Sequence, residues 1–118
     1  MPIPDFQALM LPALEAFADS GEPTLAQVRE RIAAAEGLSA DDVQEMLPSG
    51  RQTVFVNRVS WAVIYMERAG LLRRVRRGLY QLTPEGERLL SRKPSRIDLN
   101  LLEEYPDFAE WSQRAKAP

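Results

Sequence analysis

The 118-residue sequence contains neither cysteine nor histidine. Without cysteine, the chain cannot form a disulfide framework, a thiol nucleophile or a thiolate metal site. Without histidine, it also lacks the general base of Ser-His-Asp and Cys-His arrangements and the commonest ligand of protein-bound metals. The sequence therefore excludes most familiar hydrolase chemistry, and we expect neither catalytic residues of these types nor a metal site.

Long apolar segments are also missing from the chain. The longest unbroken apolar run has six residues, Trp61 to Met66, and no basic residue precedes Arg29. A membrane-spanning helix needs about 20 apolar residues, and a secretory signal peptide begins with basic ones. The patterns of nucleotide-binding and calcium-binding loops are absent as well. We therefore expect a soluble cytoplasmic protein that has no membrane contact and no cofactor.

What is present fits one globular domain. Hydrophobic residues make up 45% of the chain and charged residues 27%, which is ordinary for a folded protein. A chain of this length buries roughly two-thirds of its extended surface around a single core. The composition therefore predicts a domain that folds independently.

The net charge of −2 conceals a strong sorting of charges along the chain. Residues 1–50 hold 2 basic and 9 acidic side chains, residues 51–96 hold 11 and 3, and residues 97–118 hold 2 and 5. The central segment therefore carries +8, whereas the flanking segments carry −7 and −3. A basic block of this size predicts a surface that meets a polyanion. The alternative is that these arginines are merely solvated.

Apolar residues at helical spacing predict two helices near the start of the chain. The first covers residues 4–19 and contains Pro12, which cannot donate a helical hydrogen bond, so a kink or a restart is expected there. The second begins after Thr24, a good N-cap, and ends at Ala35. With the turn over residues 20–23, they form a helix, a turn and a helix.

Two further helices are predicted before residue 70. Ser39 followed by Asp42 resembles a capping box and begins a short helix that Pro48 ends. The longest helix runs from Thr53 to Ala69 and has one apolar face. Its opposite face carries Thr53, Asn57, Ser60, Ile64 and Arg68. A helix with these two faces is expected to pack on a core and to present its polar face to DNA.

A β-hairpin with a basic tip is predicted after the long helix. Residues 71–76 and 79–82 have the composition of two strands joined at Arg77 and Gly78. Helices followed by a long helix and a two-stranded hairpin are typical of a winged helix-turn-helix, in which the long helix enters the major groove of DNA. We therefore expect a mainly α fold with a small β-hairpin.

The region after the hairpin has two parts. Thr83 and Pro84 form a cap and a first-turn proline for a helix that continues to about Arg92. Residues 97–118 hold scattered apolar side chains that are broken by Pro106. This tail is either a linker or one or two short helices that pack back on the domain.

Eight residues are candidates for contacts with double-stranded DNA. The backbone amides at the start of a helix have no helical partner, so residues just before a helix are well placed to bind phosphate. Side chains on the outer face of a helix in the major groove are placed to contact bases. Arginines at the hairpin tip are better placed to meet a duplex than those along the strand, whose side chains alternate between two faces. The candidates are Arg51, Gln52, Thr53, Asn57, Arg58, Ser60, Arg76 and Arg77.

For several candidates a structural interpretation stays open. Arg51, Asn57 and Ser60 could serve only in capping or face solvent. Arg58 falls near the apolar face of the long helix, where a buried salt bridge is the alternative. Two aromatic residues of this helix, Trp61 and Tyr65, could stack on an extruded base, but aromatic residues at helical spacing favour packing in the core.

Several segments that together span almost the whole chain carry a more specific likeness. They are Pro2 to Phe6, Leu9 to Pro12, Leu47 to Gln52, Asn57 to Leu71, Arg77-Gly78 and Arg96 to Asp98. In these segments the chain resembles the N-terminal domain of the Mrr family of modification-dependent (type IV) restriction endonucleases. The resemblance implies a DNA-binding winged helix that precedes a PD-(D/E)xK nuclease domain in full-length relatives.

The catalytic motif of such a nuclease is missing from this chain. No acidic residue stands ahead of the Glu-x-Lys or Gln-x-Lys pair that a magnesium nuclease of this type requires. We therefore expect a non-enzymatic domain, either excised from a longer protein or a stand-alone relative. Residues 1–95 are expected to form the winged-helix domain. Residues 96–118 are expected to form a tail or short helices that lead to a missing domain.

The function predicted from the sequence is binding of double-stranded DNA, with methylated DNA as one option, in a modification-dependent restriction system. The nuclease domain of the full-length protein is the second expected partner. The first alternative is a transcriptional regulator with the same fold, which would need a dimer and a palindromic site. The second is a protein-interaction winged helix whose basic face meets an acidic partner. Nothing in the sequence pattern indicates an oligomeric state.

Overall fold

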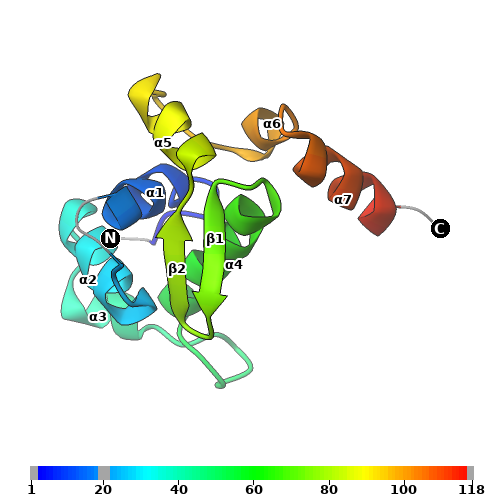
Figure 1. Cartoon of the computed structure of the whole chain (residues 1–118). Helices are drawn as coiled ribbons and strands as arrows, with labels where there is room; N and C mark the ends of the chain where they lie inside the picture. Colours follow the sequence, from blue (N-terminus) through cyan, green and yellow to red (C-terminus); the bar gives the residue numbers. More distant parts are fainter. Residues whose placement is uncertain (1–2, 19–21, 117–118) are drawn as a thin grey trace.

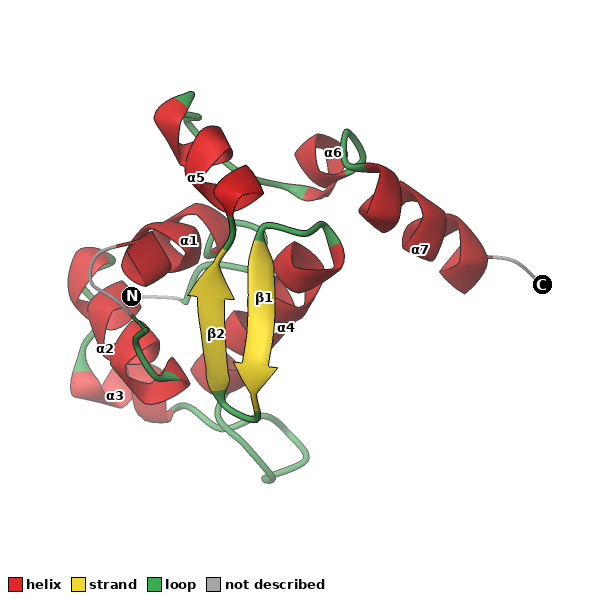
Figure 2. Cartoon of the chain, in the orientation of Figure 1, coloured by secondary structure: helices red, strands yellow, loops and turns green. Residues whose placement is uncertain are grey.

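The computed structural model describes residues 3–18 and 22–116, and within them the chain forms seven helices and one antiparallel hairpin (Figures 1 and 2). The elements are α1 (Met10–Ala18), α2 (Leu25–Ala35), α3 (Ala40–Gln44), α4 (Val54–Arg68), β1 (Leu72–Arg76), β2 (Leu79–Leu82), α5 (Pro84–Ser91), α6 (Leu99–Leu102) and α7 (Pro106–Lys116). The expected fold class, mainly α with a small hairpin, is confirmed. In these ranges no helix has both the length and the apolar character needed to cross a membrane.

The core lies between α1, α2, α4 and the hairpin. The apolar face predicted for the long helix is buried: Phe55, Val59, Ala62 and Met66 are each at most 4% exposed. No polar or charged side chain is buried in the part of the chain that the structure describes. Apolar burial therefore holds the helices together, and the charged groups are left at the surface.

The first helix begins at Met10 and not at residue 4, so its predicted start is wrong. Residues 6–9 form turns. Because Pro12 lies in the first turn of α1, where backbone N–H groups have no helical partner, its missing donor costs nothing and needs no kink. The predicted end at residue 19 and most of the predicted turn at 20–23 lie outside the described residues.

The caps of α2 and α3 are confirmed. The Thr24 and Ser39 side chains accept backbone hydrogen bonds from residues three positions on, and both form complete capping boxes. The backbone amide of Ser39 donates to the Asp42 carboxylate at 2.9 Å, and this bond, together with a smaller contribution from the Ser39 side chain, holds the pKa of Asp42 below its ordinary value.

The predicted end of the third helix is wrong, because α3 stops at Gln44. The chain after it pairs with the segment that enters α4. Met46 and Thr53 form a β-bridge, and the Val54 amide donates to the Glu45 carbonyl at 2.9 Å. We call residues 45–53 the entry loop. These long-range bonds use the backbone groups that a longer helix would need.

The hairpin forms where the sequence predicted it. Leu72 pairs with Leu82, and the two strands are joined by a two-residue turn at Arg77 and Gly78. A bulge between Arg74 and Arg76 breaks the alternation of side chains along β1. Gly78 has a φ of 77°, a left-handed conformation that glycine adopts without strain.

A third extended segment, which the sequence did not indicate, is attached to the hairpin. Thr24 forms a β-bridge with Leu79, and the Leu25 amide donates to the Gly78 carbonyl at 3.3 Å. The N-terminus of α2 is therefore tied to the tip of the hairpin. This contact fixes the direction in which the hairpin extends from the helices.

The two helices of the tail pack on the same core. Ile97, Leu102 and Phe108 are at most 2% exposed, and all three belong to the single buried cluster. The Leu99 amide donates to the side chain of Gln7 at 3.0 Å. Helix α7 contacts α4, so the segment expected to begin after residue 95 covers part of the long helix.

Gly86 in α5 is expected to tolerate no side chain. A Cβ at this position would clash with the carbonyl oxygen of Leu71 and lie 2.6 Å from Cδ1 of Leu82. The Leu71 carbonyl also accepts the Thr83 amide, so it cannot retreat freely. Gly86→Ala should therefore lower the free energy of unfolding by about 1 to 3 kcal/mol, measured by urea denaturation. Glu87→Ala, one residue on and exposed, is the control. Equal stability of the two variants would contradict this packing.

Candidate nucleic-acid interface

The first group of candidate residues lies where the entry loop joins α4. Arg51 is exposed, and Gln52 and Thr53 are half-buried. The Thr53 side chain caps α4 by accepting from the Val56 amide at 3.1 Å. The Asn57 side-chain amide donates to the side-chain oxygen of Gln52 at 2.8 Å. These two amide side chains therefore hold each other at the surface, and each keeps donors or acceptors free for another group.

Arg58 has a different environment. Its guanidinium donates to the carbonyl oxygen of Ile3 at 2.6 Å and to that of Pro4 at 3.4 Å. Among the described carboxylates none lies within ion-pair distance of it, so the salt bridge considered from the sequence is absent. Arg58 ties the N-terminal segment to α4 and is half-buried.

The second group lies on the hairpin, where β1 carries Arg73, Arg74 and Arg76 and the turn carries Arg77. All four side chains are exposed. Arg73 donates to the side-chain oxygen of Gln81, which donates in turn to a carboxylate oxygen of Glu22 at 2.7 Å. The remaining three arginines have no carboxylate within ion-pair distance in the described part of the chain.

The arginines that follow the hairpin along the chain are paired. On α5 and in the segment after it, Arg88 pairs with Glu85, Arg92 with Glu104 at 3.8 Å, and Arg96 with Asp98 at 3.7 Å. On α7, Arg114 lies 4.0 Å from Glu110. The positive charge of the central segment is therefore locally balanced after the hairpin and left unbalanced on the hairpin itself.

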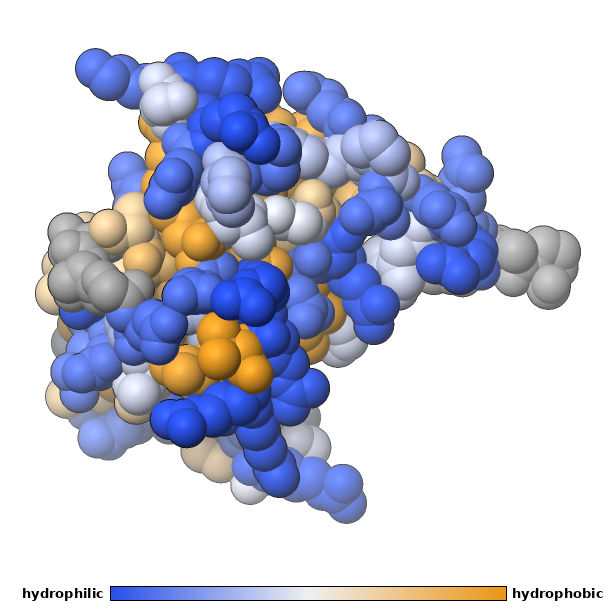
Figure 3. Space-filling view, viewed as in Figure 1, coloured by the Kyte–Doolittle hydropathy of each residue, from blue (hydrophilic) through white to orange (hydrophobic). Residues whose placement is uncertain are grey.

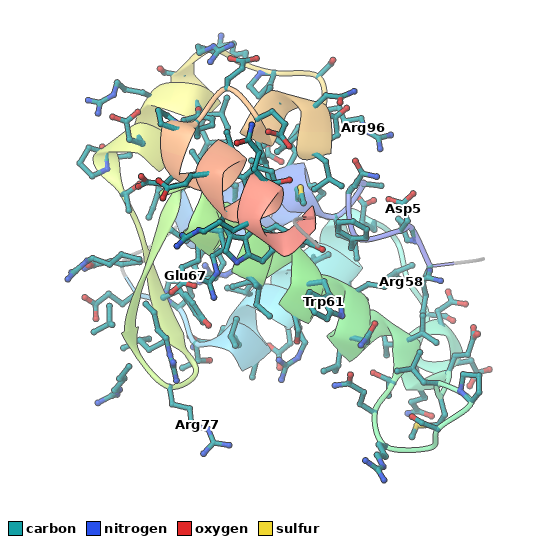
Figure 4. The ribbon with its side chains drawn as sticks, turned by 90° about the vertical axis from the view of Figure 1, so that its right-hand side faces the viewer. Asp5, Arg58, Trp61, Glu67, Arg77 and Arg96 are labelled. Atoms are coloured by element: carbon teal, nitrogen blue, oxygen red, sulfur yellow. The ribbon has the colours of Figure 1, made fainter. Side chains whose placement is uncertain are left out.

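The hairpin tip and the entry loop lie at the same end of the molecule. Both are at the lower end of Figure 1, and the view turned by 90° in Figure 4 again shows them at the lower edge, with Arg77 extending beyond the turn. Figure 3 shows that hydrophilic residues surround a small apolar patch on the face that carries the hairpin. The entry loop and the hairpin turn that carries Arg77 therefore border the same end of the fold.

Two aromatic residues of α4, Trp61 and Tyr65, differ in their exposure to solvent. Tyr65 is half-buried and its ring lies 5.3 to 6.1 Å from those of Phe6, Trp61, Phe108 and Trp111. The packing interpretation therefore holds for Tyr65. For Trp61, packing in the core is wrong, because the side chain touches Tyr65 at the edge of this cluster and is 45% exposed. Helix α7 contacts Tyr65 through Phe108 and Trp111, whereas Trp61, one turn earlier on α4, stays exposed (Figure 4).

The chain was compared with known proteins. The family described as Mrr N-terminal domain matches residues 6–92. Over 89 residues the chain is 38% identical to the type IV methyl-directed restriction enzyme EcoKMrr of Escherichia coli strain K12, which covers 73% of this chain and 28% of that enzyme. The chain thus spans less than a third of the length of this relative, and no solved structure matches it. From the family match over most of its length, we conclude that this protein belongs to the Mrr N-terminal domain family.

Proposed function

We propose that this domain binds double-stranded DNA as part of a modification-dependent restriction system. The observation that carries the proposal is the set of exposed hairpin arginines, Arg74, Arg76 and Arg77, which lack carboxylate partners in the described chain, whereas the arginines after the hairpin are paired. Unbalanced positive charge on a projecting hairpin is complementary to a phosphate backbone. The family relative named as a methyl-directed restriction enzyme supports the same function.

In this proposal the N-terminal half of α4 lies in the major groove and the hairpin lies on the adjacent backbone as a wing. Arg51 and Gln52 contact phosphates at the start of α4, where the helix dipole and free amides favour negative charge. Asn57 and Ser60 face base edges. An amide side chain such as that of Asn57 can pair with adenine through two hydrogen bonds. The bond between Asn57 and Gln52 holds the amide in place until a base replaces it.

Two other candidate residues, Thr53 and Arg58, contribute by fixing the positions of α4 and of the N-terminal segment. Thr53 caps α4 and so fixes where the helix begins. Arg58 anchors the N-terminal segment through the Ile3 carbonyl, and its remaining N–H groups are free to meet a phosphate at the rim. The chain carries no nuclease motif, so we propose that it supplies binding and that a nuclease domain of the full-length protein supplies cleavage.

Binding is expected to depend steeply on salt. If about five phosphates are neutralised, the logarithm of the association constant should fall with the logarithm of salt concentration with a slope of about −4 to −5. Fluorescence anisotropy with two unrelated 20-base-pair duplexes at four salt concentrations measures this slope. A slope near zero would contradict the proposal. A complex with an acidic protein that excess duplex does not displace would favour a protein-interaction domain instead.

A further inference from the structure

Trp61 is the only exposed aromatic side chain in the described part of the chain. It is 45% exposed, whereas the other eight aromatic residues, all in the described part of the chain, are buried or half-buried. Single exposed apolar residues are common on protein surfaces, so exposure alone indicates nothing. The position of this side chain and the way in which it is held make it informative.

The indole ring is held in a fixed place. It lies 5.8 Å from the ring of Tyr65 with a tilt of 31°, and Tyr65 in turn contacts Phe108 and Trp111 from α7. Phe6 contacts Tyr65 from the N-terminal segment. Trp61 is therefore the outer member of a packed aromatic cluster. A rigid exposed ring loses little conformational entropy when it binds a ligand.

Trp61 also lies on the stripe of α4 that the proposed function places against DNA. It follows Asn57 by four residues, so the two side chains share a helix face about 6 Å apart along the axis. This spacing is close to two base-pair steps of about 3.4 Å each. Figure 4 shows Trp61 on the surface of α4, between the hairpin with Arg77 on one side and Arg58 on the other.

On this basis, which rests on the proposed function, we infer that Trp61 is a specificity-determining residue that contacts C5-methyl groups of pyrimidines in the major groove. The thymine methyl is the apolar group that this groove offers to a side chain. 5-Methylcytosine carries the same methyl group at the same ring carbon. In this arrangement Asn57 recognises the hydrogen-bonding groups of one base, and Trp61 contacts the methyl group of a base about two base pairs away.

The test compares three forms of one 20-base-pair duplex with the 118-residue chain at a single salt concentration. One form is unmodified, one has 5-methylcytosine at every cytosine, and one has uracil at every thymine, which removes the methyl group. Burial of one methyl group contributes about fourfold to affinity. We expect tighter binding with 5-methylcytosine if a cytosine occupies the contacted position, and weaker binding with uracil if a thymine does. Either change supports the methyl contact.

Three variants show whether the preference resides in Trp61. Trp61→Ala should remove the fourfold preference and leave the salt slope unchanged, whereas Trp61→Phe should keep most of it, because a ring still meets the methyl group. Trp111→Phe keeps a ring against Tyr65 and changes no group in the proposed contact, so it should behave as the wild type. Thermal melting confirms that each variant is folded, and the wild-type comparison of duplexes needs no variant at all.

The failures are distinguishable. Salt-dependent binding with equal affinity for all three duplexes would overturn the inference and leave the proposed function intact. A preference that persists in Trp61→Ala, or an equal loss on every duplex in that variant, would also overturn it. If no duplex is bound at any salt concentration, the proposed function fails and this inference fails with it.

Discussion

Replacing both Arg76 and Arg77 with alanine is expected to weaken binding of every duplex by the same factor, about 10- to 100-fold at low salt. The two side chains are exposed at the tip of the hairpin, and neither has a carboxylate partner in the described chain. In the proposed complex they neutralise two phosphates, so the salt slope should become shallower by roughly two units. Anisotropy titrations on two unrelated duplexes at several salt concentrations measure both effects.

The chain offers a matched control for this double variant. Arg88 and Arg92 are paired with Glu85 and Glu104 on the side of the fold away from the hairpin tip. Replacing both with alanine changes the net charge by the same amount but removes no proposed phosphate contact. If this control lowers affinity and slope as much as the hairpin variant, binding follows total charge only, and the hairpin is not a wing on the backbone.

Tyr65→Ala is expected to cause the largest loss of stability among changes outside the central core. The ring contacts Phe6, Trp61, Phe108 and Trp111, so its removal leaves a cavity between α4, α7 and the N-terminal segment. We expect the free energy of unfolding to fall by about 2 to 4 kcal/mol, as measured by urea denaturation.

Tyr65→Phe is the control for that variant. The tyrosine hydroxyl makes no hydrogen bond within the described residues, so removing it should change stability by less than about 0.5 kcal/mol. A Tyr65→Ala protein as stable as Tyr65→Phe would mean that the aromatic cluster contributes nothing and that α7 is held by other contacts. In that case Trp61 would lose the support that fixes its ring.

Much of the local structure followed from the sequence, because it depends on residues that are close along the chain. The N-caps Thr24, Ser39, Thr53 and Thr83 bond to amides three residues on, an interaction that needs no tertiary partner. The burial of one face of α4 and the turn at Gly78 were predicted for the same reason. The family likeness also depended on residues that can be read in order.

Part of the candidate site could not be predicted in this way. The sequence placed Arg58 on α4 but could not show that its guanidinium bonds to the Ile3 carbonyl, 55 residues earlier. It placed both Trp61 and Tyr65 at positions typical of packing. Only the docking of α7, which contacts one turn of α4 and leaves the preceding turn open, distinguished the half-buried ring of Tyr65 from the exposed ring of Trp61.

The sequence by itself thus determined the helices from α1 to α5 and the two strands, the basic character of the hairpin and the family of the protein, because caps, turns and apolar periodicity act within a few residues. The tertiary structure decided where α3 ends, how Thr24 ties α2 to the hairpin, and which arginines lack carboxylate partners in the described chain. These features depend on contacts between groups 7 to 55 residues apart. Such contacts form only when the packing of the whole core brings those groups together, so no local pattern in the sequence specifies them.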